Sequence, residues 1–111
     1  MQKDLHTSLL LDFYGSFLTE RQREYMDLYL NSDYSLGEIA EQYGVSRQTV
    51  RDSLVRAQAQ LQAADGRLGL LKRFYAQKSL LEELRNSADD PDRVRQYVDQ
   101  INALWEDDHG F

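Results

Sequence analysis

The spacing of apolar residues limits this chain to helical folds. Leu, Ala, Gln, Glu and Arg are abundant, only one Pro and six Gly interrupt the sequence, and no stretch alternates apolar and polar residues for long. Apolar residues return instead every three or four positions, as they do on one face of an α-helix. We therefore predict an all-α fold.

Two pairs of polar residues mark the beginnings of helices. Thr19 with Gln22 and Ser35 with Glu38 have the spacing of a capping box, in which each side chain bonds the backbone N–H group of the other residue. They predict a second helix after Thr19 and a short third helix after Ser35. Before them, a first helix is expected to bury a stripe of residues four positions apart, Leu5, Leu9, Phe13 and Phe17, with Leu10 and Tyr14 beside it.

The stretch SLGEIAEQYGVSRQTV has the form of a helix-turn-helix unit. Such a unit needs a small residue where its helices cross, a turn residue that tolerates positive φ, and apolar residues that fix the interhelical angle. Ala40, Gly44 and Val50 stand at these offsets. Ser53 is a departure, because an apolar residue is expected there, and we expect Leu54 to be buried in its place.

The first turns of the predicted fourth helix contain the candidate nucleic-acid-binding residues. In this type of unit the N-terminal residues of the second helix meet the nucleic acid first. Arg binds phosphate or guanine, Gln pairs with adenine, and hydroxyl groups bond phosphate oxygens. The candidates are Ser46, Arg47, Gln48, Thr49 and Arg51. The alternative is a solvated face that only keeps the protein soluble.

A second pattern on the fourth helix has the alternating four- and three-residue spacing of a coiled-coil seam. Its members are Val50, Leu54, Ala57, Leu61, Ala64, Leu68, Leu71 and Tyr75. The seam either packs against the first helix of the same chain or forms a homodimer interface, and both interpretations stay open. Gly66 and Gly69 lower helix propensity, so the helix either runs past Gly66 or breaks near Asp65.

A second basic run, RLGLLKRFYAQK, interleaves cations with aromatic rings. Its cations are Arg67, Lys72, Arg73 and Lys78. They could hold a phosphate backbone while Phe74 and Tyr75 stack on unpaired RNA bases. The alternative is that the rings belong to the core and the cations are solvated.

Charge is unevenly distributed along the chain, whose formal net charge is −6. The net charge is −3 over residues 1–34, 0 over 35–60, +2 over 61–88 and −5 over 89–111. Both ends therefore repel a polyanion. We expect any binding to DNA or RNA to be weak and to depend strongly on salt.

The segment SADDPDRVRQ marks the one change in composition and suggests a boundary. We predict a helix-turn-helix domain with a long helical extension over residues 1–86. An acidic hinge and a C-terminal amphipathic helix are predicted over residues 87–111. Asp90 is the expected N-cap, Pro91 the first helical residue, and Trp105 is expected to be docked. The last residues, EDDHGF, are expected to fray.

Catalysis finds no support in the sequence. It contains no Cys, its two His residues lie far apart in sequence, and it has neither a phosphate-binding Gly loop nor a nucleophile elbow. We expect no enzyme activity, no cofactor and no metal site. No apolar run approaches the roughly 18 residues of a membrane span, and the absence of Cys suits a reducing compartment, so we expect a cytoplasmic protein.

The stretch LTERQREYMDLYLNSDYSLGEIAEQYGVSRQTVRDSL closely resembles the region-four DNA-binding module of bacterial sigma factors. With the preceding LLLDFYGSF it resembles more narrowly the YlxM family of small bacterial proteins, over roughly residues 6–85. The resemblance implies a cytoplasmic bacterial regulatory protein linked to the signal recognition particle pathway. Of the family's functional residues, those of the sigma-like recognition helix transfer to this sequence, namely Arg47, Gln48, Thr49 and Arg51.

Two hypotheses follow for this non-enzymatic, dimeric protein. In the first, the fourth helix reads nucleic acid and the protein acts as a regulator. In the second, the protein is an interaction scaffold that binds a component of the signal recognition particle, either its GTPase or its RNA, without reading DNA.

Overall fold

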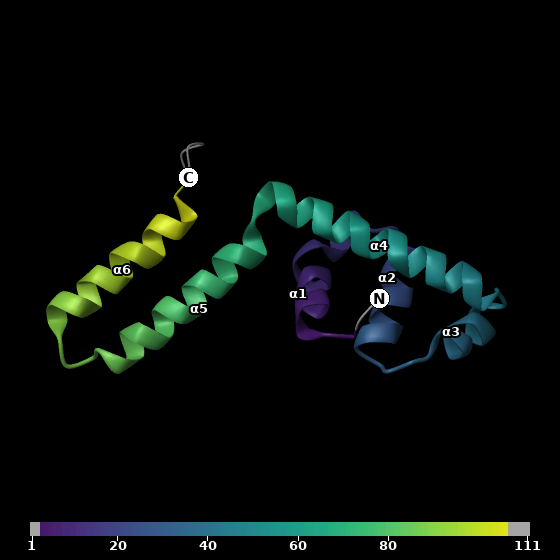
Figure 1. Cartoon of the computed structure of the whole chain (residues 1–111), viewed down its shortest axis with the longest axis horizontal. Helices are drawn as coiled ribbons and strands as arrows, with labels where there is room; N and C mark the ends of the chain where they lie inside the picture. Colours follow the sequence, from purple (N-terminus) through teal and green to yellow (C-terminus); the bar gives the residue numbers. More distant parts are fainter. Residues whose placement is uncertain (1–2, 107–111) are drawn as a thin grey trace. The chain divides into compact units, whose positions relative to one another are not determined.

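The structure, a computed structural model, describes residues 3–106, which form six α-helices and one 3₁₀-helix and contain no strand. The elements are α1 (Leu5–Tyr14), the 3₁₀-helix η1 (Gly15–Phe17), α2 (Glu20–Leu30), α3 (Leu36–Tyr43), α4 (Arg47–Leu68), α5 (Leu70–Asn86) and α6 (Pro91–Trp105). They belong to two compact units, Met1–Gly69 and Leu70–Phe111 (Figure 1). The predicted all-α fold is confirmed.

Reciprocal side-chain bonds fix where α2 and α3 begin. The Thr19 hydroxyl accepts a hydrogen bond from the Gln22 N–H at 3.1 Å, and the Gln22 side chain accepts one from the Thr19 N–H at 2.9 Å. Ser35 and Glu38 form the same pair of bonds, both at 3.1 Å. Each bond satisfies a backbone donor that the first helical turn leaves without a partner. Both predicted capping boxes are confirmed.

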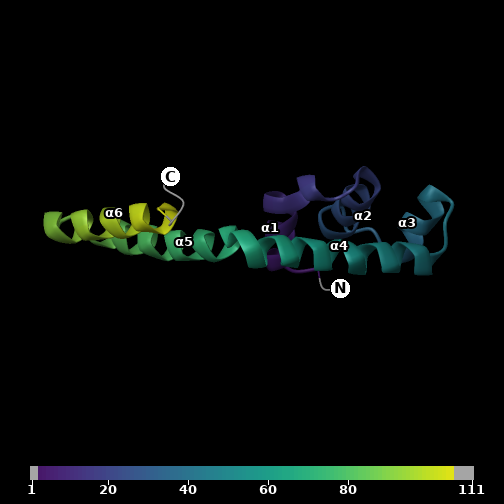
Figure 2. The ribbon, with the colours of Figure 1, turned by 90° about the horizontal axis from the view of Figure 1, so that it is seen from above.

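The first unit is built around α4. Helices α1, α2 and α3 each contact it, and Figure 2 shows them along its length. These contacts bury one face of α4, at Val50, Leu54, Ala57, Leu61 and Ala64. These residues are the first five members of the predicted seam. Over this length the seam therefore packs within its own chain, and it does not form a dimer interface.

The buried face of α1 agrees with the prediction at Leu10 and Tyr14 but differs from the predicted four-residue stripe. Leu5 is 67% exposed and Phe17 is 60% exposed, and the buried residues are Thr7, Leu10, Leu11 and Tyr14. A strict four-residue repeat drifts around a helix of 3.6 residues per turn, whereas the observed set stays on one face. In addition, α1 ends at Tyr14 and the chain continues as η1, so Phe17 is not on the helix at all.

Two polar contacts fix the ends of α1. Before the helix, the Asp4 carboxylate accepts a hydrogen bond from the Thr7 N–H at 2.8 Å, and this bond lowers the pKa of Asp4. This N-cap was not predicted from the sequence, although Asp is among the residues that favour the position. At the other end, the buried Tyr14 hydroxyl donates to Asp65 Oδ1 at 2.7 Å and ties α1 to the last turns of α4.

Helix α4 runs through Asp65 and Gly66 and ends at Leu68. Gly69 follows in the left-handed conformation, with φ of 68°, and its N–H donates to the Asp65 carbonyl oxygen at 2.7 Å. This is the usual way in which a glycine closes a helix. The units divide at this residue, whereas the change in composition suggested a boundary after residue 86. The reason is that α5 packs against α6.

The second unit consists of α5 and α6, which lie side by side (Figure 1). Asp90 caps α6 through a bond from the Arg93 N–H at 3.3 Å, and Pro91 opens the helix, as predicted. Trp105 Nε1 donates to Gln77 Oε1 at 2.6 Å while the residue stays 38% exposed. No helix within residues 3–106 is both long and apolar enough to cross a membrane. The segment expected to fray lies, from residue 107, outside the described residues.

Candidate nucleic-acid interface

The turn between α3 and α4 has the backbone geometry that a helix-turn-helix requires. Gly44 has φ of 66° and ψ of 35°, a left-handed conformation that costs glycine little. The Val45 N–H donates to the Ala40 carbonyl oxygen at 3.0 Å and closes α3. Ala40 is 5% exposed and Val50 is fully buried, so a small and a branched side chain fill the crossing of the two helices. Leu54, rather than the half-buried Ser53, completes this packing, as predicted.

All five candidate residues are exposed around the N-terminus of α4. They are Ser46, Arg47, Gln48, Thr49 and Arg51. The buried Val50 between them anchors the helix, while its neighbours face away from the core. The N-terminus of a helix carries a partial positive charge, which favours an anion such as phosphate. The structure thus brings these residues together on one exposed helix end.

Three hydrogen bonds hold the polar side chains of this helix end in place. The Ser46 hydroxyl accepts a bond from the Thr49 N–H at 3.0 Å and lies 2.9 Å from the Thr49 hydroxyl. Gln48 Nε2 donates to Asp52 Oδ1 at 2.8 Å. To bond a base edge, the amide of Gln48 has to exchange this partner. Asp52 also places a negative charge beside the candidate residues, which opposes the approach of phosphate.

Arg47 lies across the beginning of α3. A Cβ atom built on Gly37 would stand 3.0 Å from Arg47 Nε, 3.2 Å from Nη2 and 3.3 Å from Cζ. The guanidinium group therefore occupies the space that any larger residue at position 37 would need. Sequence reasoning missed Gly37, because the contact depends on how α3 crosses α4.

A polar and aromatic contact braces α3 against α2. The Tyr43 hydroxyl donates to Glu24 Oε2 at 2.7 Å, and the Tyr43 ring lies edge-on to the Tyr25 ring with 5.0 Å between centroids. The Arg21 guanidinium lies 4.7 Å from the centre of the Tyr43 ring. Bonding to the Glu24 carboxylate raises the pKa of Tyr43. This brace holds the last residue of α3, directly before the turn, against α2.

The second basic run is divided between the two units. Arg67 belongs to α4, whereas Lys72, Arg73 and Lys78 belong to α5. The Arg73 guanidinium lies 6.0 Å from the centre of the Trp105 ring. Phe74 and Tyr75 contact each other edge-on, with 5.6 Å between their centroids. Within the second unit Phe74 and Tyr75 thus contact each other, and Arg73 lies near the ring of Trp105.

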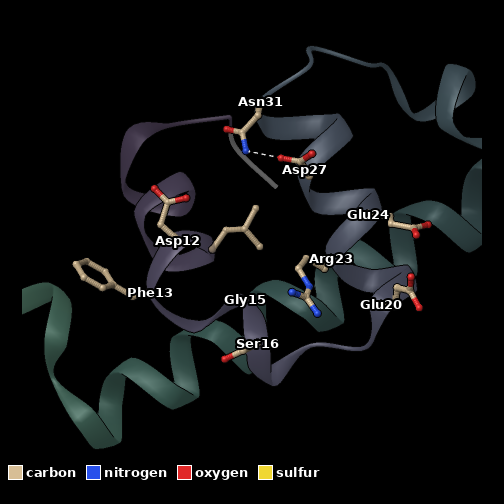
Figure 3. A pocket seen from close by; sticks show the side chains of 10 residues that line it. Asp12, Phe13, Gly15, Ser16, Glu20, Arg23, Glu24, Asp27 and Asn31 are labelled. Carbon is tan, nitrogen blue, oxygen red and sulfur yellow. Dashed lines mark hydrogen bonds between the residues drawn. The ribbon is translucent and has the colours of Figure 1, made fainter.

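A hollow of the first unit lies between α1 and α2, with a volume of about 760 Å³ (Figure 3). Its charged lining consists of Asp12, Glu20, Glu24, Asp27 and Arg23. Four carboxylates against one guanidinium repel phosphate, so this hollow does not suit a nucleic acid. Among residues 3–106, no group of three or more His, Cys, Asp or Glu side chains is placed to hold a metal ion.

The crossing of α3 and α4 at Ala40, the left-handed Gly44 and the exposed start of α4 define a helix-turn-helix protein. The chain belongs to the UPF0122 family, described as "Putative helix-turn-helix protein, YlxM / p13 like", which it matches over residues 1–101. This finding confirms the family resemblance predicted from the sequence.

Bacterial relatives match most of the chain. The UPF0122 protein YlxM of Bacillus subtilis is 40% identical over 104 residues, which cover 94% of each chain. A UPF0122 protein of Bacillus licheniformis is 39% identical over 104 residues, covering 94% of this chain and 97% of the relative. A UPF0122 protein of Acetivibrio thermocellus is 51% identical over 84 residues, covering 76% of this chain and 72% of the relative.

Proposed function

We propose that this protein is a bacterial cytoplasmic regulator that binds nucleic acid through the first turns of α4. The observation that carries the proposal is the contrast along this helix. Val50 and Leu54 are buried against α3 and the rest of the first unit, while five polar residues around Val50 are exposed on one helix end. An exposed helix end of this composition, held at a fixed angle by a packed partner helix, suits insertion into the major groove.

Each candidate side chain has a defined part in the proposed complex. Arg47 and Arg51 neutralise phosphates or bond the edge of a guanine. Gln48 bonds adenine after it releases Asp52, which it contacts in the structure. The hydroxyl groups of Ser46 and Thr49 bond phosphate oxygens together with the N-terminal backbone N–H groups of α4.

The charge of the protein sets how tightly it binds. Arg47, Arg51 and Arg56 are the only cations on the first three turns of α4, and the whole chain carries a net charge of −6. Two or three phosphate contacts correspond to a slope of about −2 to −3 in a plot of log affinity against log salt concentration. We therefore propose weak binding that is lost quickly as salt rises.

A second candidate function belongs to a different class. The chain acts in this case as a scaffold that binds a component of the signal recognition particle, its GTPase or its RNA, without reading DNA. The exposed apolar side chain of Val55, 49% exposed beside Arg51 and Arg56, favours a protein partner, because it adds an apolar contact to a basic surface. The acidic balance of the chain also suits a protein partner better than a duplex.

Salt-titrated binding measurements separate the two functions. Random duplex DNA and the RNA of the signal recognition particle are titrated in parallel with the wild-type protein and an Arg47→Ala, Arg51→Ala double variant. A double variant of equal charge on α6, Arg93→Ala with Arg95→Ala, is the control. If α4 binds the nucleic acid, only the first variant loses affinity, by about tenfold to a hundredfold, and its salt slope flattens. Equal losses in both variants contradict the proposed site.

The proposed regulator acts as a homodimer. The seam on α4 does not supply the interface, since its residues from Val50 to Ala64 are buried within the first unit. The proposed homodimer interface therefore lies on another surface of the chain.

A further inference from the structure

The α5–α6 unit exposes apolar side chains that it cannot bury by itself. Helix α6 has no buried residue, although Val94, Tyr97, Val98, Ile101, Leu104 and Trp105 form one apolar stripe along it. Of the described residues of this unit, only Leu71 and Ser87 are buried. Two helices of this length do not enclose a core, and small units usually depend on a partner, a metal or a disulfide. The chain contains no Cys that could form a disulfide.

The exposed apolar residues gather along one edge of the helix pair. Val98 and Trp105 are seven residues apart, which places them two turns apart on the same face of α6. Trp105 bonds Gln77 of α5, so this face lies at the junction of the two helices. Leu81 stands one turn beyond Gln77 on α5. Leu81 is 47% exposed, Val98 41% and Trp105 38%, so together they form an apolar edge along the junction.

We propose that this apolar edge, Leu81, Val98 and Trp105, packs against the same edge of a second copy of the chain. The two helix pairs then form a four-helix bundle. The inference rests on the proposed homodimer and specifies its interface.

Charge indicates how the two copies are arranged. Residues 70–86 carry four cations and two anions, a net charge of +2, whereas residues 87–106 carry two cations and five anions, a net charge of −3. A two-fold axis that sets each α5 against the partner's α6 brings the basic segment to the acidic segment twice. Pairing α5 with α5 would instead oppose like charges. The self-complementary arrangement favours a second copy over a partner of either charge.

The first test measures the mass of the protein in solution over a range of concentrations by light scattering and sedimentation. The proposal expects a wild-type dimer that dissociates on dilution, and a Leu81→Glu, Val98→Glu variant that is monomeric. Val55→Glu, at an equally exposed apolar position on α4, should remain dimeric. Since the substituted residues are exposed, circular dichroism should show unchanged helix content. A monomeric wild type, or a double variant that still forms dimers, overturns the proposal.

The second test examines the pairing of α5 with the partner's α6. One variant carries Lys78→Glu and Arg85→Glu, three residues before and four residues after Leu81 on α5, and the other carries Asp92→Lys and Asp99→Lys on α6. Each alone should weaken its homodimer by about tenfold or more, and a mixture of the two should form a heterodimer of near wild-type affinity. If the α6 variant dimerises normally, the pairing is wrong. Because these positions lie outside α4, failure here leaves the nucleic-acid proposal intact, and failure of DNA or RNA binding leaves the dimer intact.

Discussion

The guanidinium group of Arg47, the first residue of α4, covers Gly37 in the first turn of α3. A Cβ atom on Gly37 would stand 3.0 Å from Arg47 Nε, closer than most Cβ contacts in proteins, so the guanidinium group would have to shift by a few tenths of an ångström. Because Gly37 has no side chain, the Arg47 guanidinium group can pack against α3. This contact lies at the start of α4, where the proposed interface begins.

Replacement of Gly37 by Ala is predicted to weaken nucleic-acid binding through Arg47 alone. The added methyl group displaces the guanidinium group, while helix α3 itself is stabilised by up to about 1 kcal/mol because Ala is the better helix former. We expect a loss of affinity of about threefold to tenfold without a loss of stability, measured by fluorescence anisotropy and urea unfolding. In an Arg47→Ala background the same change should have no further effect, and an additive loss there would falsify the assignment.

Asp52 is predicted to restrain binding. Its carboxylate accepts the amide of Gln48 at 2.8 Å and opposes phosphate at the exposed helix end. Asp52→Asn removes the charge and keeps the size of the side chain, so affinity for duplex DNA at low salt should rise by about threefold to tenfold. Asp12→Asn, in the acidic hollow between α1 and α2, is the control and should change affinity less. Equal gains in both variants indicate a general effect of net charge.

Two glycines in open space are predicted to respond to alanine in opposite directions. A Cβ atom on Gly44 or on Gly66 meets nothing within 4 Å. The effect of alanine on stability therefore depends only on the backbone conformation at each position. Gly44 has φ of 66°, and Gly44→Ala should lower the free energy of unfolding by about 1–2 kcal/mol. Gly66 lies inside α4, and Gly66→Ala should raise it by about 0.5–1 kcal/mol. Urea unfolding followed by circular dichroism measures both, and losses of equal size contradict the reasoning.

Stability at high pH is predicted to depend on Tyr43. Its hydroxyl donates to the Glu24 carboxylate, which raises its pKa above the ordinary value of 10.0. The stabilisation is therefore complete below about pH 10 and is lost as the pH rises through the higher folded-state value. A Tyr43→Phe variant should be less stable than wild type at pH 8, and the difference should shrink towards pH 11. Thermal unfolding across this range tests the expectation, which a constant difference contradicts.

Local signals in the sequence predicted the helix boundaries well. A capping box involves residues three positions apart, so Thr19 and Ser35 could be identified without knowing the fold. Gly44 was predictable for the same reason, since its conformation and the turn around it are set by neighbours. Helix α4 ends at Leu68, directly before Gly69, rather than near Asp65, because a single glycine inside a helix lowers stability without ending it.

Contacts between helices were harder to predict. The seam from Val50 to Ala64 had the same spacing whether its partner was α1 of the same chain or a second copy, and only the packed unit decides this. The stripe of Leu5 and Phe17 failed because an exact four-residue repeat does not stay on one helical face. Gly37 carried no signal, because its role depends on a side chain ten residues later.

The left-handed Gly69 closes α4 one residue before the second unit begins. A fragment that stops at Gly69 would retain every cap of α2, α3 and α4 and the buried Tyr14–Asp65 bond. Such a fragment would be small enough for its amide resonances to be assigned individually. Chemical shift mapping with a short oligonucleotide could then locate the contact surface residue by residue, with α5 and α6 removed from the spectrum.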